Sequence, residues 1–492
     1  MSEQNENAEK KEEKPKVKVE DKRVETQHEI KLNGKKLSYT AVAGTIVLHD
    51  EEDKKAPQPK GEIFYIAYTL NSEKKKEKRP ITFSFNGGPG SSSVWMHLGL
   101  LGPKRVPMSD DNNELIRPPY EVEDNEFSIL DQTDLVFIDP VGTGFSRPVE
   151  GEEGQQFWNF TKDIESVGEF IRMYTTREQR WSSPKFLIGE SYGTTRAAGL
   201  SGYLQQRHGM FLNGIMLVSV ILNFQTARFE PGNDLPYPLF LPTYAATAWY
   251  HKKLQAPYQS MPLAEFLTEV ADFAESEYTL ALMRGAKLSD SEKNFVIQRL
   301  AAYTGLTPTY LEQTNMRINI HRFCRELLRD ESKAVGRLDS RMTSYNRDEA
   351  GEFNEFDPAF PIITGVYSGA MNQYIRQDLN FEADIPYEIL SFKVFPSWKY
   401  SKFMNAYVNT AETLRSAMTQ NPHLRIFVAN GYYDLATPFF ATEYTFNHLG
   451  LKSHLLDNIT MQYYEAGHMM YVHKPSLAKL KGDLVAFLAE SV

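Results

Sequence analysis

The sequence of 492 residues lacks several features that define large classes of proteins. It contains one cysteine, Cys324, so a disulfide within the chain and a cysteine-based metal site are both excluded. No apolar run reaches the roughly 20 residues that a membrane-spanning helix needs. Basic residues do not outnumber acidic ones, and the net charge of −10 argues against a nucleic-acid partner, because phosphate binding needs a basic surface.

The beginning of the chain also lacks the apolar segment of a secretory signal peptide, since Glu, Lys, Asn and Gln dominate residues 1–23. Together with the single cysteine, this favours a reducing compartment and predicts a cytoplasmic protein. A periplasmic or secreted location stays open for a chain whose natural N-terminus differs. Residues 1–25 are predicted to form a disordered tail of mixed charge. We expect neither a membrane nor a nucleic acid among the partners.

The stretch 186–195 holds the strongest functional signal. Apolar residues 186–188 end a predicted buried strand, and Gly189-Glu190-Ser191-Tyr192-Gly193 follows as a G-x-S-x-G pattern before a predicted helix. A serine on so sharp a turn needs glycines two positions away on either side, because the flanking backbones approach closely. The turn exposes the Ser191 hydroxyl at the carboxyl end of the sheet and directs the Tyr192 amide toward a developing oxyanion. The pattern therefore predicts a serine nucleophile.

Buried strands alternate with helical patterns on both sides of this motif. The predicted strands are 80–85, 134–140, 186–188, 214–220, 424–429 and 459–464, after antiparallel strands within 28–48 and at 61–68. This rhythm predicts an α/β protein with a mostly parallel central sheet. We interpret 224–396 as an inserted helical cap on a core formed by 26–223 and 397–492. Helices are expected at 263–284, 289–303, 309–329 and 402–418.

A glycine-rich loop, 86–93, follows the predicted strand 80–85. A phosphate cradle is weakly supported there, because no Walker lysine follows Gly90 and the G-x-G-x-x-G spacing is missing. An oxyanion loop fits better, since residues without a Cβ let backbone amides approach a site closely. A plain tight turn is the remaining alternative.

Two further side chains are placed at the same edge of the sheet. Asp434 and His468 each follow the carboxyl end of a predicted strand, where parallel sheets gather ligands and catalytic groups. The order Ser191, Asp434, His468 is that of the α/β-hydrolases. Neutral His468 would take the Ser191 proton, and Asp434 would hold the imidazole tautomer. The simpler alternatives are a turn-forming aspartate and an ordinary histidine; His473, the nearest other histidine, precedes a helix.

Several blocks of the sequence resemble those of the serine carboxypeptidases, peptidase family S10. The chain looks like a bacterial-type member of that family. The blocks are Asn86-Gly87-Gly88-Pro89-Gly90-Ser91-Ser92, Gly189-Glu190-Ser191-Tyr192-Gly193, Asn430-Gly431-Tyr432-Tyr433-Asp434 and Gly467-His468, with 141–146 similar to one more. This resemblance implies an α/β-hydrolase fold with a helical cap insertion. It also implies an acyl-enzyme mechanism that releases C-terminal residues from peptides, with no metal or organic cofactor.

The resemblance further implies roles for four residues. The amides of Gly88 and Tyr192 would form the oxyanion hole, and Asn86 and Glu190 would bind the terminal carboxylate of a peptide. Two carboxyl groups in contact cannot both ionise cheaply, so Glu190 is expected to hold a proton. A homodimer is plausible from the family alone.

The chain departs from the family pattern at three positions. Family members usually carry a tryptophan two positions before the motif asparagine, a glutamate before the later Leu-Gly-Pro, and often a cysteine after Gly-Pro-Gly; Ser84, Leu100 and Ser91 stand there. We therefore expect a thinner carboxylate-binding network. An esterase or acyltransferase with the same triad is the alternative function, and a non-enzymatic binding protein on a hydrolase fold is the third.

Overall fold

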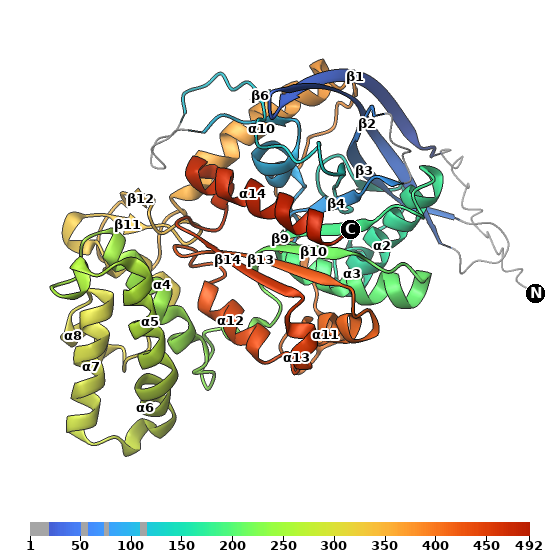
Figure 1. Cartoon of the computed structure of the whole chain (residues 1–492). Coiled ribbons are helices and arrows are strands. Elements are labelled where there is room, and N and C mark those ends of the chain that lie inside the picture. The colour runs from blue at the N-terminus through green and yellow to red at the C-terminus, as the bar shows by residue number, and fades with distance from the viewer. Residues whose placement is uncertain (1–18, 51–57, 73–77, 109–115) are drawn as a thin grey trace, which may run out of the picture.

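The computed structural model describes residues 19–50, 58–72, 78–108 and 116–492. One large sheet runs through the molecule with helices on both faces, and a further group of helices stands beside it (Figure 1). The predicted α/β fold with a mostly parallel sheet is confirmed. Residues 1–18 of the predicted tail lie outside the described residues. The predicted tail boundary at residue 25 is wrong, because strand β1 (Lys22–Leu32) already pairs with β2 from its first residue.

The sheet has an antiparallel part and a parallel part. Its strand order is β1-β2-β3-β7-β4-β9-β10-β13-β14, and β8 (Arg147–Pro148) pairs with β3. The strands of the antiparallel part are β1, β2 (Lys35–Asp50) and β3 (Gln58–Leu70). The parallel strands are β4 (Ile81–Phe85), β7 (Asp134–Ile138), β9 (Lys185–Ser191), β10 (Gly214–Val220), β13 (Arg425–Gly431) and β14 (Ile459–Tyr464). The strands that precede the sequence motifs therefore end at one edge of the sheet.

Alternate residues of the parallel strands build two separate cores, as the period of a strand requires. Phe186 and Ile188 of β9 pack on the side of α10 (Ala359–Gln377) and α14 (Lys474–Glu490). Leu187, between them, packs on the opposite side, where the helices are α2 (Phe160–Arg177), α3 (Tyr192–His208) and α11 (Ala411–Gln420). Both faces of the sheet are buried, which explains why these strands appear in the sequence as continuous apolar runs.

A third apolar cluster joins the helices at the lower left of Figure 1. They are α4 (Pro236–Tyr250), α5 (Leu263–Phe273), α6 (Thr279–Arg284), α7 (Asp290–Thr304), α8 (Pro308–Gln313) and α9 (Ile320–Glu326). This cluster also takes in Tyr433 and Leu435, which follow β13, and Phe439 of α12 (Phe439–Asn447). Helix α10 falls inside the interval 224–396 but packs with the sheet. The division of the chain at 224 and 396 stays a prediction.

Two predicted helices differ from the structure. The helix expected at 402–418 begins only at Ala411, because the backbone before it bonds to the loop after β10: Phe224 N donates to Val408 O and Thr410 N to Leu222 O. The helix expected at 309–329 is broken between α8 and α9, where Asn315 and Met316 adopt positive φ. The span 263–284 is helical throughout, with a π-helical turn, Ala274–Tyr278, between α5 and α6. Within the described ranges, no helix is both long and apolar enough to cross a membrane.

Candidate active site

Ser191 occupies the sharp turn between β9 and α3. Its backbone is held at φ 60° and ψ −129°, a region that residues other than glycine rarely adopt. A Cβ at Gly189 would collide with the Gly193 carbonyl, and a Cβ at Gly193 would lie 2.9 Å from Phe85 O. Both glycines of the motif are therefore required by close backbone approach.

The glycine-rich loop after β4 lies directly against this turn. A Cβ at Gly87 would lie 2.5 Å from Tyr192 N, the first amide of α3, and 2.8 Å from Gly193 N. Gly88 adopts φ 100°, which suits glycine alone, and it lines the same pocket as Ser191. The loop thus brings backbone amides to the helix N-terminus, where partial positive charge gathers.

Asp434 and His468 form a buried hydrogen-bonded pair beyond the ends of β13 and β14. His468 Nδ1 lies 2.8 Å from Asp434 Oδ2, which also accepts from Thr437 Oγ1 at 2.6 Å. Asp434 Oδ1 accepts from the amides of Ala436 at 2.8 Å and Thr437 at 3.0 Å. Burial by itself lowers the pKa of His468, but the charge and hydrogen bond of Asp434 oppose it, and the pKa is raised from its ordinary value. The arrangement fixes the tautomer with Nε2 free.

Asn86 and Glu190 form a second buried pair beside the turn. Asn86 Nδ2 donates to Glu190 Oε1 at 3.0 Å, and Met96 N donates to Asn86 Oδ1 at 3.1 Å. Glu190 is 4% exposed, and among the described residues its Oε2 has no hydrogen-bond partner. Burial raises the pKa of Glu190 to about 7, although the nearby His468 charge acts in the opposite direction.

These side chains meet in one pocket of about 340 Å³. Asn86, Glu190, Ser191 and His468 all line it. Both Ser191 and His468 are described, and no hydrogen bond joins their side chains; such catalytic bonds often tighten only when substrate binds. Most of the remaining wall is apolar, from Phe360, Ile363, Leu390, Phe392, Phe395 and Met469. In the ranges that the structure describes, no three His, Cys, Asp or Glu side chains gather as a metal site would require.

Residues 54–474 match the family described as serine carboxypeptidase. The chain belongs to this family. A part of it is similar to the pheromone-processing carboxypeptidase KEX1 of Saccharomyces cerevisiae, with 37% identity over 157 residues, 30% of this chain and 20% of that protein. Serine carboxypeptidase-like 36 of Arabidopsis thaliana is 37% identical over 185 residues, 37% of this chain and 35% of that protein. The matched region thus spans well under half of either relative.

A solved structure extends the likeness to nearly the whole fold. It is that of KEX1(delta)p, a prohormone-processing carboxypeptidase from Saccharomyces cerevisiae, with a TM-score of 0.56 and 17% sequence identity. The alignment covers 92% of this chain and 91% of that one. At this identity the comparison supports the α/β-hydrolase fold and not a particular substrate.

The three positions that depart from the family pattern lie in different places: Ser91 lines the pocket, whereas Ser84 and Leu100 are outside its lining. Ser84 of β4 is buried, and among the described side chains its Oγ has no hydrogen-bond partner. Leu100 is fully buried in the apolar cluster of the sheet, within the π-helical segment His97–Leu101. Leu100 has no acidic proton to donate, so no carboxyl group stands at this position.

Supporting residues that the sequence analysis missed tie the turn to the glycine loop. Arg196 of α3 bonds Asp163 of α2 through Nε at 3.0 and 2.9 Å, and its Nη1 donates to Asn86 O at 2.7 Å. Asp163 also accepts from Tyr192 Oη at 3.1 Å. The three side chains are buried, so the ion pair fixes α3 against the loop that carries Asn86. The only sequence signal was an arginine on the apolar start of α3.

A second missed group fixes the His468 loop. His468 N donates to Leu338 O at 2.6 Å, and Ser219 Oγ donates to His468 O at 2.6 Å. Gly467 N donates to Asp339 Oδ2 at 3.2 Å, and Asp339 is paired with buried Arg341. The segment that returns from the helical cluster therefore holds the loop that carries His468 in place.

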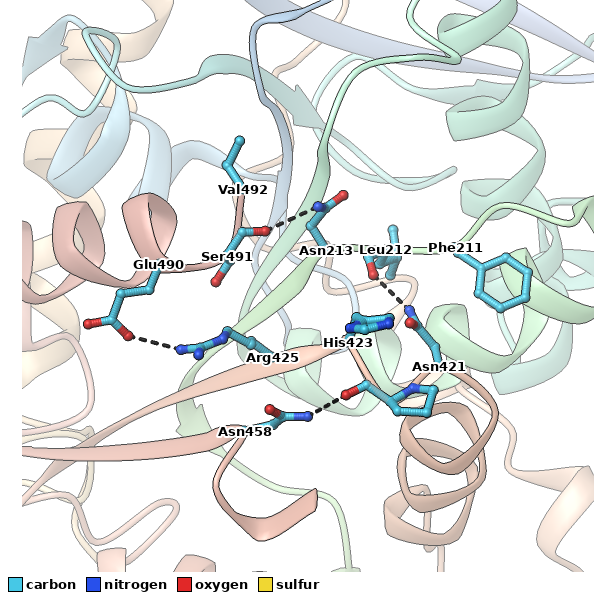
Figure 2. A pocket seen from close by; sticks show the side chains of 11 residues that line it. Phe211, Leu212, Asn213, Asn421, His423, Arg425, Asn458, Glu490, Ser491 and Val492 are labelled. Carbon is cyan, nitrogen blue, oxygen red and sulfur yellow. Dashed lines mark hydrogen bonds and ion pairs between the residues drawn. The ribbon is translucent and has the colours of Figure 1, made fainter. Parts of the chain in front are cut away.

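A larger cavity, about 490 Å³, lies at the other ends of the parallel strands (Figure 2). It opens beside Gly214 and Arg425, where β10 and β13 begin, so it is remote from Ser191. Its polar groups bond to one another: Arg425 to Glu490, Asn213 to Ser491 O, Asn421 to Leu212 O and Asn458 to Pro422 O. The side chains of Arg425, Asn213, Asn421 and Asn458 are therefore already paired with groups of the protein.

Proposed function

We propose that this protein is a serine-type carboxypeptidase that releases C-terminal residues from peptides through an acyl-enzyme. The observation that carries this proposal is the buried pair of Asn86 and Glu190 in the pocket of Ser191, with one carboxyl oxygen of Glu190 unpartnered among the described residues. A buried carboxyl group next to a nucleophile, when protonated, suits recognition of a terminal carboxylate.

The triad would act by proton transfer through His468. Ser191 Oγ attacks the scissile carbonyl carbon while His468 Nε2 takes its proton, and the oxyanion is stabilised by the amides of Gly88 and Tyr192. His468 then gives the proton to the departing amine, and the C–N bond breaks to leave an ester on Ser191. Water attacks the ester, again with its proton passing to His468, and the acid leaves with Ser191 restored. Asp434 stabilises the imidazolium at each stage.

Recognition would depend on the protonation of Glu190. Below a pH of about 7 the carboxyl is protonated and can donate to the substrate carboxylate, together with Asn86. Above that pH both groups are ionised and repel one another. His468 must be neutral to accept the Ser191 proton, so activity also falls on the acidic side. The acidic and alkaline limbs of the pH profile of activity belong to a coupled pair of groups, since Glu190 and His468 interact electrostatically.

The test compares a blocked dipeptide with its C-terminally amidated twin from about pH 4 to pH 8. We expect cleavage of the free acid alone, with kcat/KM falling on the alkaline side. Glu190→Gln should retain a hydrogen-bond donor that cannot ionise and should lose this alkaline fall. Ser191→Ala should lower the rate about 10⁶-fold.

The rival is an esterase or acyltransferase with the same triad, which the largely apolar pocket wall would also suit. Equal cleavage of the two substrates would replace the proposal by this rival. Equal activity of Ser191→Ala and the parent protein would overturn both.

A further inference from the structure

Two buried tyrosines stand behind Glu190, outside the lining of the pocket. Tyr471 lies in the short 3-10 helix Met470–Val472, three residues after His468, and Tyr367 lies in α10. They are 2% and 0% exposed. Among the residues that the structure describes, neither hydroxyl has a hydrogen-bond partner, and the same holds for Glu190 Oε2. Leaving three such groups buried together without partners is costly, because each has lost its hydrogen bonds to water.

The unpartnered groups are neighbours. A Cβ added at Gly99 would lie 2.6 Å from Tyr367 Oη and 2.6 Å from the ring of Tyr471, so the two phenols meet at this one glycine. The Tyr471 hydroxyl faces the carboxyl of Glu190 and the amide of Asn86. Gly99 is the residue before Leu100, in the segment His97–Leu101. Because Gly99 has no side chain, this segment leaves room for the two phenols.

The charged surroundings of this cluster come from four elements. Glu190, at the end of β9, faces His468 and Asp434 from the loops after β14 and β13, besides Tyr471 and Tyr367. The charge of Arg105, in β5 (Lys104–Arg105), also acts on Tyr367 and opposes the rise of its pKa. Burial is the main cause that raises the pKa of both tyrosines, so each remains a hydrogen-bond donor across the working range.

We propose that Tyr471 is a positioning residue for recognition of the substrate carboxylate, with Tyr367 supporting it. When a peptide's terminal carboxylate enters the pocket, the Tyr471 hydroxyl donates to Glu190 Oε2. Asn86 already donates to Oε1, which leaves Oε2 to carry the acid proton toward the substrate while it accepts from Tyr471. A phenol, which stays protonated in this pH range, thereby donates the hydrogen bond to Glu190 that a second, protonated carboxyl group would otherwise donate. The inference rests on the carboxypeptidase activity proposed above.

Tyr471→Phe removes the donor and keeps the ring. For the free-acid dipeptide we expect KM to rise about tenfold, the loss of one hydrogen bond to an ionisable group, while kcat changes less than about twofold. The alkaline limb of kcat/KM should move to higher pH, because the Tyr471 hydroxyl, which faces Glu190 and lowers the pKa of its carboxyl, is gone. An ester substrate without a free carboxylate should be hydrolysed as by the parent protein.

Tyr464→Phe is the matched control. Tyr464 is also 2% exposed, but its hydroxyl donates to Asp483 at 2.6 Å, away from the pocket. It should change neither KM nor the alkaline limb. Tyr367→Phe should act in the same direction as Tyr471→Phe and more weakly, and it carries the test if Tyr471→Phe does not fold.

The two proposals fail in different ways. If the parent protein cleaves the amidated twin as well as the free acid, the proposed function is wrong. If the parent discriminates between them but Tyr471→Phe keeps the parent KM and alkaline limb, the role of Tyr471 is wrong. A uniform fall in rate on free-acid and ester substrates alike would also overturn it, as the sign of a merely structural role.

Discussion

Asp434 is the side chain whose chemistry is most tightly constrained, because both of its oxygens are occupied by hydrogen-bond donors. In Asp434→Asn an amide group would meet His468 Nδ1 and favour the wrong tautomer, while the size of the side chain is kept. We expect kcat/KM on a free-acid peptide to fall about 10⁴-fold, with the circular dichroism spectrum unchanged. Steady-state kinetics measure the loss. A fall of less than about tenfold would mean that the pair does not serve catalysis.

The residues of this site differ in how far the sequence could predict them. Ser191, Asp434 and His468 were placed together because each follows a strand, and β9, β10, β13 and β14 lie in that order and direction. Arg196 and Tyr471 could not be assigned in the same way. Their roles depend on Asp163 and Glu190, and no local pattern tells which distant side chains two packed elements bring into contact.

The turn between β9 and α3 depends on Gly189 for its shape. Gly189→Ala would push a Cβ into the Gly193 carbonyl, so the start of α3 must shift. We expect an activity loss of about 10²-fold or more, because small displacements of reacting groups are costly. Gly482→Ala is the control: the position is exposed in α14 with nothing within 4 Å of the added Cβ. It should leave activity intact and stabilise by about 0.5–1 kcal/mol. Equal behaviour of the two variants would contradict the argument.

The segment between α9 and α10 is expected to support catalysis through Arg341. This side chain is 3% exposed, pairs with Asp339 at 2.6 Å and donates to Glu465 O at 2.7 Å, next to the His468 loop. Arg341→Met leaves Asp339 buried and unpaired, which should cost about 3–5 kcal/mol and lower kcat. Denaturant unfolding and kinetics on the same samples measure both.

The control for this variant is Arg425→Met, at the start of β13 and so at the opposite ends of the parallel strands from the His468 loop. Its pair with Glu490 is exposed, with side-chain accessibilities of 34% and 62%, and its loss should cost less than about 1 kcal/mol. If both variants lose the same stability and Arg341→Met keeps full kcat, the Asp339–Arg341 pair does not hold the histidine loop.

The molecule as a whole shows which parts of a fold a sequence specifies locally. The parallel sheet was predicted because short continuous apolar runs are typical of strands that are buried on both faces. The helix 263–284 was predicted because its apolar residues recur at helical spacing. The breaks at 314–319 and 404–410 were missed, since they depend on backbone bonds to distant loops and on positive φ at Asn315 and Met316. The packing of Tyr433 and Leu435 in the helical cluster likewise depends on contacts between distant parts of the chain, which no local pattern predicts. This packing bears on whether 224–396 is a separate domain.

Whether the helical cluster and the sheet unfold as one unit is the last prediction. The backbone bonds that link them include Ser340 N to Tyr433 O and Leu435 N to Arg337 O, each 3.0 Å. Phe323 is fully buried in the helical cluster with its ring centroid 4.1 Å from that of Tyr244, so Phe323→Ala should cost about 3–5 kcal/mol. We expect calorimetry to show one transition at a lower temperature, with activity lost in step.

The matched control is Phe295→Ala, in α7 of the same cluster, where the side chain is 51% exposed. Its unfolding temperature should stay close to that of the parent protein. Two separated transitions in Phe323→Ala, with activity surviving the first, would show that the helical cluster is an independent domain. In that case the links through Tyr433 and Leu435 are too weak to couple the helical cluster to the sheet.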